Sequence, residues 1–264
     1  MAQIGFIHIS NIVSETEAMF DVYFQITPLQ VLLLTLIMTL GAALQGSAGY
    51  GMALLVSPIL LLIAPTLIPG PLISAAFFLT ILMLIREKQS IDFKGLQWAS
   101  IGMIIGVTVG TLLLYRISTE LVSIVFAISI LFAVLISISG FKFKPEPWVV
   151  LLAAIIAGFM GIITTTAGPP LAIVYQESEG GHLRSMIGGV FIIGSIASFI
   201  SLAIIGRFGV NEFLHSLILY PGILLGYLVS NKVIRNFDNA VIRPLVLGIS
   251  ALSGIVILIR QLLQ

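Results

Sequence analysis

Two short segments concentrate glycine, proline and neutral polar residues inside otherwise apolar sequence. The first is LQGSAGYGMALLVSP at 44–58, and the second is TTTAGPP at 164–170. Glycine and proline interrupt helices, and an interrupted helix leaves backbone N–H and C=O groups without partners. In hydrocarbon such groups cost several kcal/mol each, so irregular backbone persists there only when it is buried in protein or lines a polar cavity. The two segments therefore predict a ligand site built from freed backbone groups.

The charge pattern around these segments favours an anion as the ligand. Residues 28–85 and 147–176 contain no charged side chain, whereas a cation path usually contains an intramembrane Asp or Glu. An anion can instead be held by helix N-termini, each equivalent to about half a positive charge. Helices beginning near Met52 and Pro169 would supply them. The predicted substrate site comprises Gln45, Gly46, Ser47, Gly49, Tyr50, Gly51, Thr164, Thr165, Thr166, Gly168 and Pro169.

Glycines in membrane helices have a second role, because small residues let helices pack closely. We assign that role to glycines that recur at four-residue spacing, namely Gly102, Gly106, Gly110, Gly222 and Gly226. Gly46, Gly49 and Gly51 share no single helix face, which favours a functional break there. Two alternatives stay open: the hydroxyls of 164–166 can bond back to their own helix, and Tyr50 can be either a gate or an interface anchor.

The composition places the chain in a membrane. Of 264 residues, 59% are hydrophobic and 9% are charged, against roughly 25% charged in soluble domains. The 12 Lys and Arg nearly cancel the 11 Asp and Glu, so we expect no nucleic-acid partner. There is no cysteine, and His8, His182 and His215 lie in the leader or near the ends of spans. We therefore expect no enzyme activity and no metal site.

The positions of basic residues favour a topology with two re-entrant hairpins. Six stretches fit single crossings, at 69–85, 96–115, 119–139, 183–206, 212–229 and 240–259. Residues 28–66 and 147–176 are interrupted. If each of these stretches crosses the membrane once, seven basic residues lie on one face of the membrane and five on the other. If each folds back to the face it left, nine lie on one face and three on the other, which is the asymmetry that the positive-inside rule expects. The nine are Arg86, Lys88, Lys94, Lys142, Lys144, Arg184, Lys232, Arg235 and Arg243, leaving Arg116, Arg207 and Arg260.

The same topology predicts an all-α fold of two inverted repeats, each a broken helical hairpin followed by three transmembrane helices. The first repeat covers 28–140, the charged segment 141–147 is the linker, and the second repeat covers 148–264. Residues 1–27 form an N-terminal leader without Lys or Arg, unlike a signal peptide. With the nine basic residues facing the cytoplasm, both termini are predicted to be non-cytoplasmic.

These residues resemble the sulfite exporter TauE/SafE family, within the toluene sulfonate uptake permease superfamily. Its first pattern, G-x-x-x-Q-G-x-x-G-x-G followed by P-x-L, is matched by Gly41, Gln45, Gly46, Gly49, Gly51, Pro58 and Leu60. Its second pattern is matched in part by Gly158, Gly168 and Pro169, while Thr165 and Thr166 stand where glycine is common. The resemblance runs from about 28 to 260. It implies a permease for sulfite, sulfoacetate or other sulfonates in the cytoplasmic membrane, with no prosthetic group.

Our leading hypothesis is a multi-pass secondary transporter, an exporter by resemblance, that moves a small anion by alternating access. Its partners are that anion and the lipid bilayer, and the sequence leaves a homo-oligomer open. The alternatives are a passive anion channel, a carrier of a different solute, and a non-transporting membrane scaffold.

Overall fold

The computed structural model describes residues 27–87, 93–141, 143–175, 177–178, 180–233 and 239–263. Over these residues the chain is all-helical, and six helices are long and apolar enough to cross a membrane. The predicted fold class, an all-α polytopic membrane protein, is thereby confirmed. The predicted leader lies outside the described residues except for Thr27. The helices are α2 (Pro28–Ala48), α3 (Met52–Ile63), η1 (Pro65–Leu67), α4 (Gly70–Arg86), α5 (Phe93–Arg116), α6 (Thr119–Ile138), α7 (Pro147–Thr164), α8 (Gly168–Tyr175), α9 (Gly180–Ile204), α10 (Val210–Ser216), η2 (Leu217–Leu219), α11 (Tyr220–Val233) and α12 (Asn239–Leu262).

The first interrupted stretch forms a helical hairpin, α2–α3. Gly49 (φ 91°) and Gly51 (φ 115°) adopt left-handed conformations between the helices, which glycine tolerates without steric cost. The Gln30 side chain near the start of α2 donates to the carbonyl of Ile63 at the end of α3, at 3.2 Å. The end of α3 therefore lies beside the start of α2, so the hairpin returns to the side of the bundle from which it began. At about 18 Å, the 12-residue α3 is too short to cross a bilayer core of about 30 Å.

The second interrupted stretch is the α7–α8 hairpin. Here the left-handed position is taken by Thr165 (φ 61°), and no other non-glycine residue has positive φ in the described part of the chain. The second helix, α8, has only 8 residues. Both hairpins thus combine one helix near spanning length with one short helix, and each break lies at a left-handed residue.

Both breaks are narrower than predicted. Gly46 and Ser47 remain inside α2, because its last turn is closed by the Gly49 N–H donating to the Gln45 carbonyl at 2.7 Å. Similarly Thr164 still belongs to α7, and α8 begins at Gly168, one residue before the predicted start.

The glycines that recur at four-residue spacing lie where two helices pack closely, which confirms the packing role assigned to them. A Cβ on Gly102 or Gly106 of α5 would collide with the backbone of α7, and one on Gly222 or Gly226 would collide with the backbone of α2. Hence α5 packs on α7 and α11 packs on α2. A hairpin from one half of the chain is therefore held by a helix from the other half.

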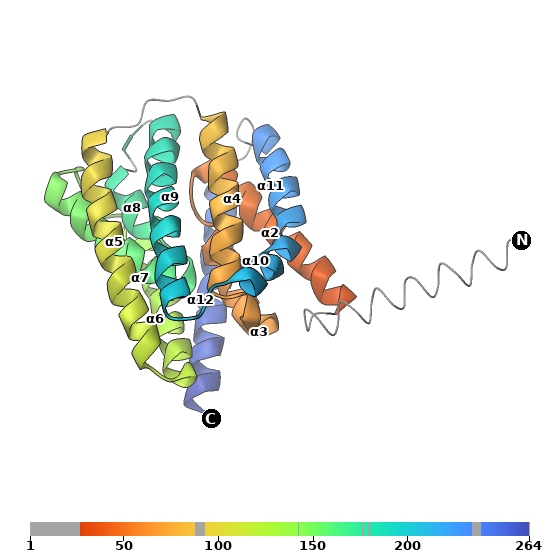
Figure 1. Ribbon diagram of the computed structural model, residues 1–264. Helices are drawn as coiled ribbons and strands as arrows, with labels where there is room; N and C mark the ends of the chain where they lie inside the picture. Colours follow the sequence, from red (N-terminus) through yellow and green to blue (C-terminus); the bar gives the residue numbers. More distant parts are fainter. Residues whose placement is uncertain are drawn as a thin grey trace, which may run out of the picture.

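Two further pairs complete the bundle. Helices α4 and α9 lie side by side, and α6 packs on α12 (Figure 1). We call the end of the bundle where α4 finishes the Arg86 end. At the opposite end, Gly70 at the start of α4 lies against Phe208 and the carbonyl of Arg207. The span predicted at 212–229 lies within Val210–Asn231, one of the six stretches long and apolar enough to cross a membrane. Inside it the single turn η2 separates α10 from α11.

Candidate substrate site

The two hairpins meet at a cavity in the interior of the bundle. The cavity has a volume of about 50 Å³, and residues of six helices (α2, α3, α4, α5, α7 and α9) and of the α7–α8 break line it. Met103 and Val107 contribute from near the middle of α5, which places the cavity deep between the two ends. The remaining lining residues are Gln45, Ala53, Ile73, Ala76, Thr80, Gly158, Gly161, Thr165, Ala167, Phe191, Gly194, Ser195 and Ser198.

A smaller cavity of about 10 Å³ lies between the two breaks and shares Gln45, Ala53, Thr165 and Phe191 with the larger one. Its other lining residues are Gly51, Leu54, Thr166, Gly168 and Pro169. These belong to the first turns of α3 and α8 or lie within two residues before them. Two helix N-termini therefore border one small space, and together they are equivalent to about one positive charge.

Polar side chains at the cavity lack protein partners. Gln45 is 3% exposed and Ser198 is 4% exposed. Neither side chain makes a hydrogen bond to any described residue, and both line the larger cavity. The Thr165 hydroxyl is fully buried beside it and also has no partner among the described residues. Buried polar groups are normally hydrogen-bonded, so these three side chains are suited to bind a polar solute in the cavity.

The hairpins also contact each other directly. The buried Ser57 hydroxyl of α3 donates to the carbonyl of Thr164, which has no helical partner because it lies at the end of α7 and which also accepts from the Thr166 hydroxyl. Gly168 lies under Tyr50: a Cβ there would come within 2.8 Å of the tyrosine ring. Tyr50 thus fixes the start of α8 against the first break.

A third contact supports the broken helix α3. Pro58 lies inside this helix and cannot donate to the carbonyl of Leu54, four residues earlier. The buried Ser250 hydroxyl of α12 donates to that carbonyl at 2.6 Å. A serine from the last helix therefore replaces the hydrogen bond that proline removes beside the site.

Six of the predicted site residues line the cavities, and five do not. Those in the lining are Gln45, Gly51, Thr165, Thr166, Gly168 and Pro169. The Thr164 hydroxyl donates to the Met160 carbonyl at 2.8 Å. For this residue the alternative interpretation, a hydroxyl bonded to its own helix, is therefore correct. Ser47 likewise donates to the Leu44 carbonyl. Gly49 packs on Arg184, and the carbonyl of Gly46 accepts a hydrogen bond from Arg86.

Two serines of the lining were missed by the sequence analysis. Ser195 and Ser198 lie on α9, an unbroken helix with no local signal of function. Isolated serines in membrane helices usually bond back to their own backbone, as Ser100 and Ser137 do here. Only the packing of α9 against the hairpins distinguishes Ser195 and Ser198 from those.

No charged side chain belongs to either cavity as described, and the described residues contain no cluster of His, Asp and Glu able to hold a metal. The site thus offers amide and hydroxyl groups and helix N-termini. The family model described as "Sulfite exporter TauE/SafE" matches residues 33–257. No curated protein and no solved structure shows significant similarity to the chain.

Proposed function

The chain belongs to the sulfite exporter TauE/SafE family, and we propose that it is a secondary transporter of sulfite, organosulfonates or related small organic anions. Membership of a transporter family agrees with the expectation that the chain is not an enzyme. The proposed transport is by alternating access in the cytoplasmic membrane, in the direction of export.

One observation carries the proposal. Gln45 and Ser198 are nearly fully buried yet unpartnered among the described residues, and they line a deep cavity. A smaller cavity beside it shares Gln45 and lies at the N-termini of α3 and α8. Neutral donors and helix dipoles can replace the hydration of an anion. Because none of them carries a full charge, they can also release it.

The dimensions of the site favour a compact anion. A water molecule occupies about 10–15 Å³ on the same volume measure, so the cavity of about 50 Å³ accommodates a solute of a few heavy atoms. Sulfite and methanesulfonate are of this size. A longer organosulfonate requires the hairpins to separate from α4 and α9.

The helix pairing supports the two proposed repeats, 28–140 and 148–264. Helix α2 packs on α11 and α7 packs on α5, while α3 packs on α12 and α8 packs on α6. If each helix is replaced by the helix at the same place in the other repeat, the α2–α11 pair becomes the α7–α5 pair, and the α3–α12 pair becomes the α8–α6 pair. Substrate sites between inverted repeats with discontinuous helices are characteristic of alternating-access transporters.

Counterflow in proteoliposomes tests the proposal. Purified full-length protein should take up radiolabelled sulfite saturably, and sulfite or methanesulfonate on the opposite side should accelerate uptake. The Gln45→Ala variant should lose most of this flux. An unsaturable conductance would indicate a passive channel instead, and protein that moves no anion would indicate a scaffold.

A further inference from the structure

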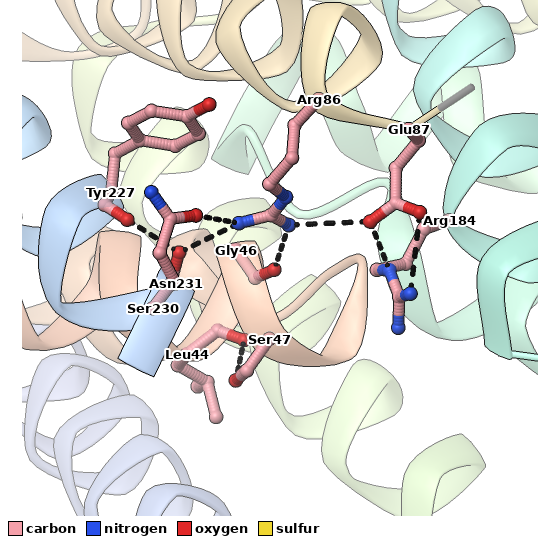
Figure 2. Close-up of polar contacts among 9 residues, drawn as sticks. All are labelled: Leu44, Gly46, Ser47, Arg86, Glu87, Arg184, Tyr227, Ser230 and Asn231. Carbon is pink, nitrogen blue, oxygen red and sulfur yellow. Dashed lines mark hydrogen bonds and ion pairs between the residues drawn. The ribbon is translucent and has the colours of Figure 1, made fainter. Parts of the chain in front are cut away.

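A charged cluster outside the cavity joins the helices that form it. Arg86 at the end of α4 donates to the Ser230 hydroxyl at 3.0 Å and to the Asn231 side-chain oxygen at 2.8 Å, both on α11. Its guanidinium also donates to the Gly46 carbonyl and lies 5.4 Å from the centre of the Tyr227 ring. Figure 2 shows Arg86 between α11, α2 and Glu87.

Glu87 extends the cluster to a fourth helix. Its carboxylate accepts two hydrogen bonds from Arg184 of α9, at 2.6 and 3.3 Å, and lies 3.4 Å from Arg86. The side chains are 18% exposed for each arginine and 11% for Glu87. Forked, charge-assisted bonds of this kind are stronger and more directional than exposed ion pairs. We call Arg86, Glu87 and Arg184 the charged clasp.

The charged clasp holds the tip of the first hairpin. Gly46 belongs to the last turn of α2, where backbone carbonyls lack helical partners and the helix dipole is negative. A cation there is favourable, and it fixes the residue directly next to Gln45. Left-handed Gly49 packs on the other arginine, since a Cβ would lie 2.9 Å from Arg184 Cγ.

The same cluster bridges α4 and α9, the adjacent helices that both line the cavity. Ala76 and Thr80 line it from α4, and Ser195 and Ser198 line it from α9. A path from the cavity to the Arg86 end along this seam requires α4 and α9 to separate there. The Glu87–Arg184 bonds oppose that separation.

We propose that Arg86 is a positioning residue that aims Gln45 at the substrate, and that the charged clasp keeps the site closed toward the Arg86 end of the bundle. Transport through that end then requires the clasp to break and re-form in each cycle. The closure is a property of the fold, while the positioning role rests on the proposed function.

The closure can be tested without transport, because the chain contains no cysteine. Ala76→Cys places one thiol in the cavity lining, and a membrane-impermeant charged thiol reagent then measures access in nanodiscs. Adding Glu87→Gln should raise the labelling rate about tenfold, the change that about 1.4 kcal/mol produces. Arg184→Lys, which keeps the charge but loses the fork, should give a smaller rise.

Arg116→Gln is the matched control, because Arg116 is exposed at the end of α5 and has no partner among the described residues. It should leave labelling unchanged. Equal labelling in the control and in both clasp variants, with melting temperatures preserved, would overturn the closure. This result would stand whether or not the protein carries anions.

The positioning role is tested by separating KM from the maximal rate of sulfite uptake. Arg86→Gln should raise KM about tenfold, and Arg86→Lys should recover part of it because an ammonium can still bind the Gly46 carbonyl. A merely structural arginine would lower protein yield and melting temperature but leave KM unchanged, and that outcome would refute the assignment. Absence of flux in the wild type would instead reject the proposed function.

Discussion

Thr165 carries a stability cost that its replacement by glycine should remove. It is β-branched and left-handed, with φ 61° and ψ 5°, at the turn between α7 and α8. Its hydroxyl is buried without a partner among the described residues. We predict that Thr165→Gly makes the protein more stable and weakens its affinity for the anion.

The magnitude follows from three effects. The left-handed conformation costs an L-residue about 1–2 kcal/mol, and an unpartnered buried hydroxyl costs about 1–3 kcal/mol. Glycine loses about 0.5–1 kcal/mol through the greater freedom of the unfolded chain. The net stabilisation should be about 1–4.5 kcal/mol, and each kcal/mol should raise the melting temperature by roughly 2–4 °C.

The assay is thermal unfolding of purified protein, with and without sulfite. Thr165→Gly should melt higher than wild type without ligand and gain less from added sulfite, since ligand bound only by the folded state stabilises it. Thr165→Asn is the matched control, because asparagine tolerates the left-handed region and retains a polar donor. A glycine variant that melts lower than wild type, or responds fully to sulfite, would refute this explanation of Thr165.

Three other predictions concern the hairpins and the ligand. Ser250→Ala should destabilise the protein by about 1–3 kcal/mol, because the Leu54 carbonyl that Pro58 leaves free loses its donor; an unchanged melting temperature would contradict this. Gly106→Ala should sharply reduce the monodisperse fraction in gel filtration, because the added Cβ would collide with α7. Gly248→Ala should be tolerated, because a Cβ there would have no atom within 4 Å. Equal monodisperse fractions for the two variants would argue against close α5–α7 packing. Methanesulfonate, a monoanion, should raise the melting temperature more than sulfate, because two helix N-termini supply only about one positive charge; the reverse order would contradict the assignment of charge to the site.

The two breaks could be predicted because their signals are local. Glycine at non-helical spacing and paired prolines mark a helix end wherever the chain packs, so the structure has its breaks within the predicted segments. Their limits were too wide because a single left-handed residue suffices to end a helix, at Gly49 in one hairpin and at Thr165 in the other.

The rest of the site depends on contacts between distant parts of the chain. Ser195 and Ser198 become lining residues only because α9 packs beside the hairpins. Likewise Arg86 was predicted only as one of nine basic residues on one face, and its bonds to Gly46 and Asn231 span 40 and 145 positions. No pattern of spacing within one helix encodes such contacts.

Equilibrium binding of radiolabelled sulfite to the purified chain tests the central claim most directly. Gln45→Leu removes an unpartnered amide from the cavity, and Gln30→Leu is the control because Gln30 binds Ile63 away from the site. We predict saturable binding that methanesulfonate displaces, that Gln30→Leu retains and that Gln45→Leu weakens at least about tenfold, the equivalent of about 1.4 kcal/mol. Binding unaffected by Gln45→Leu would contradict a site between the two broken hairpins.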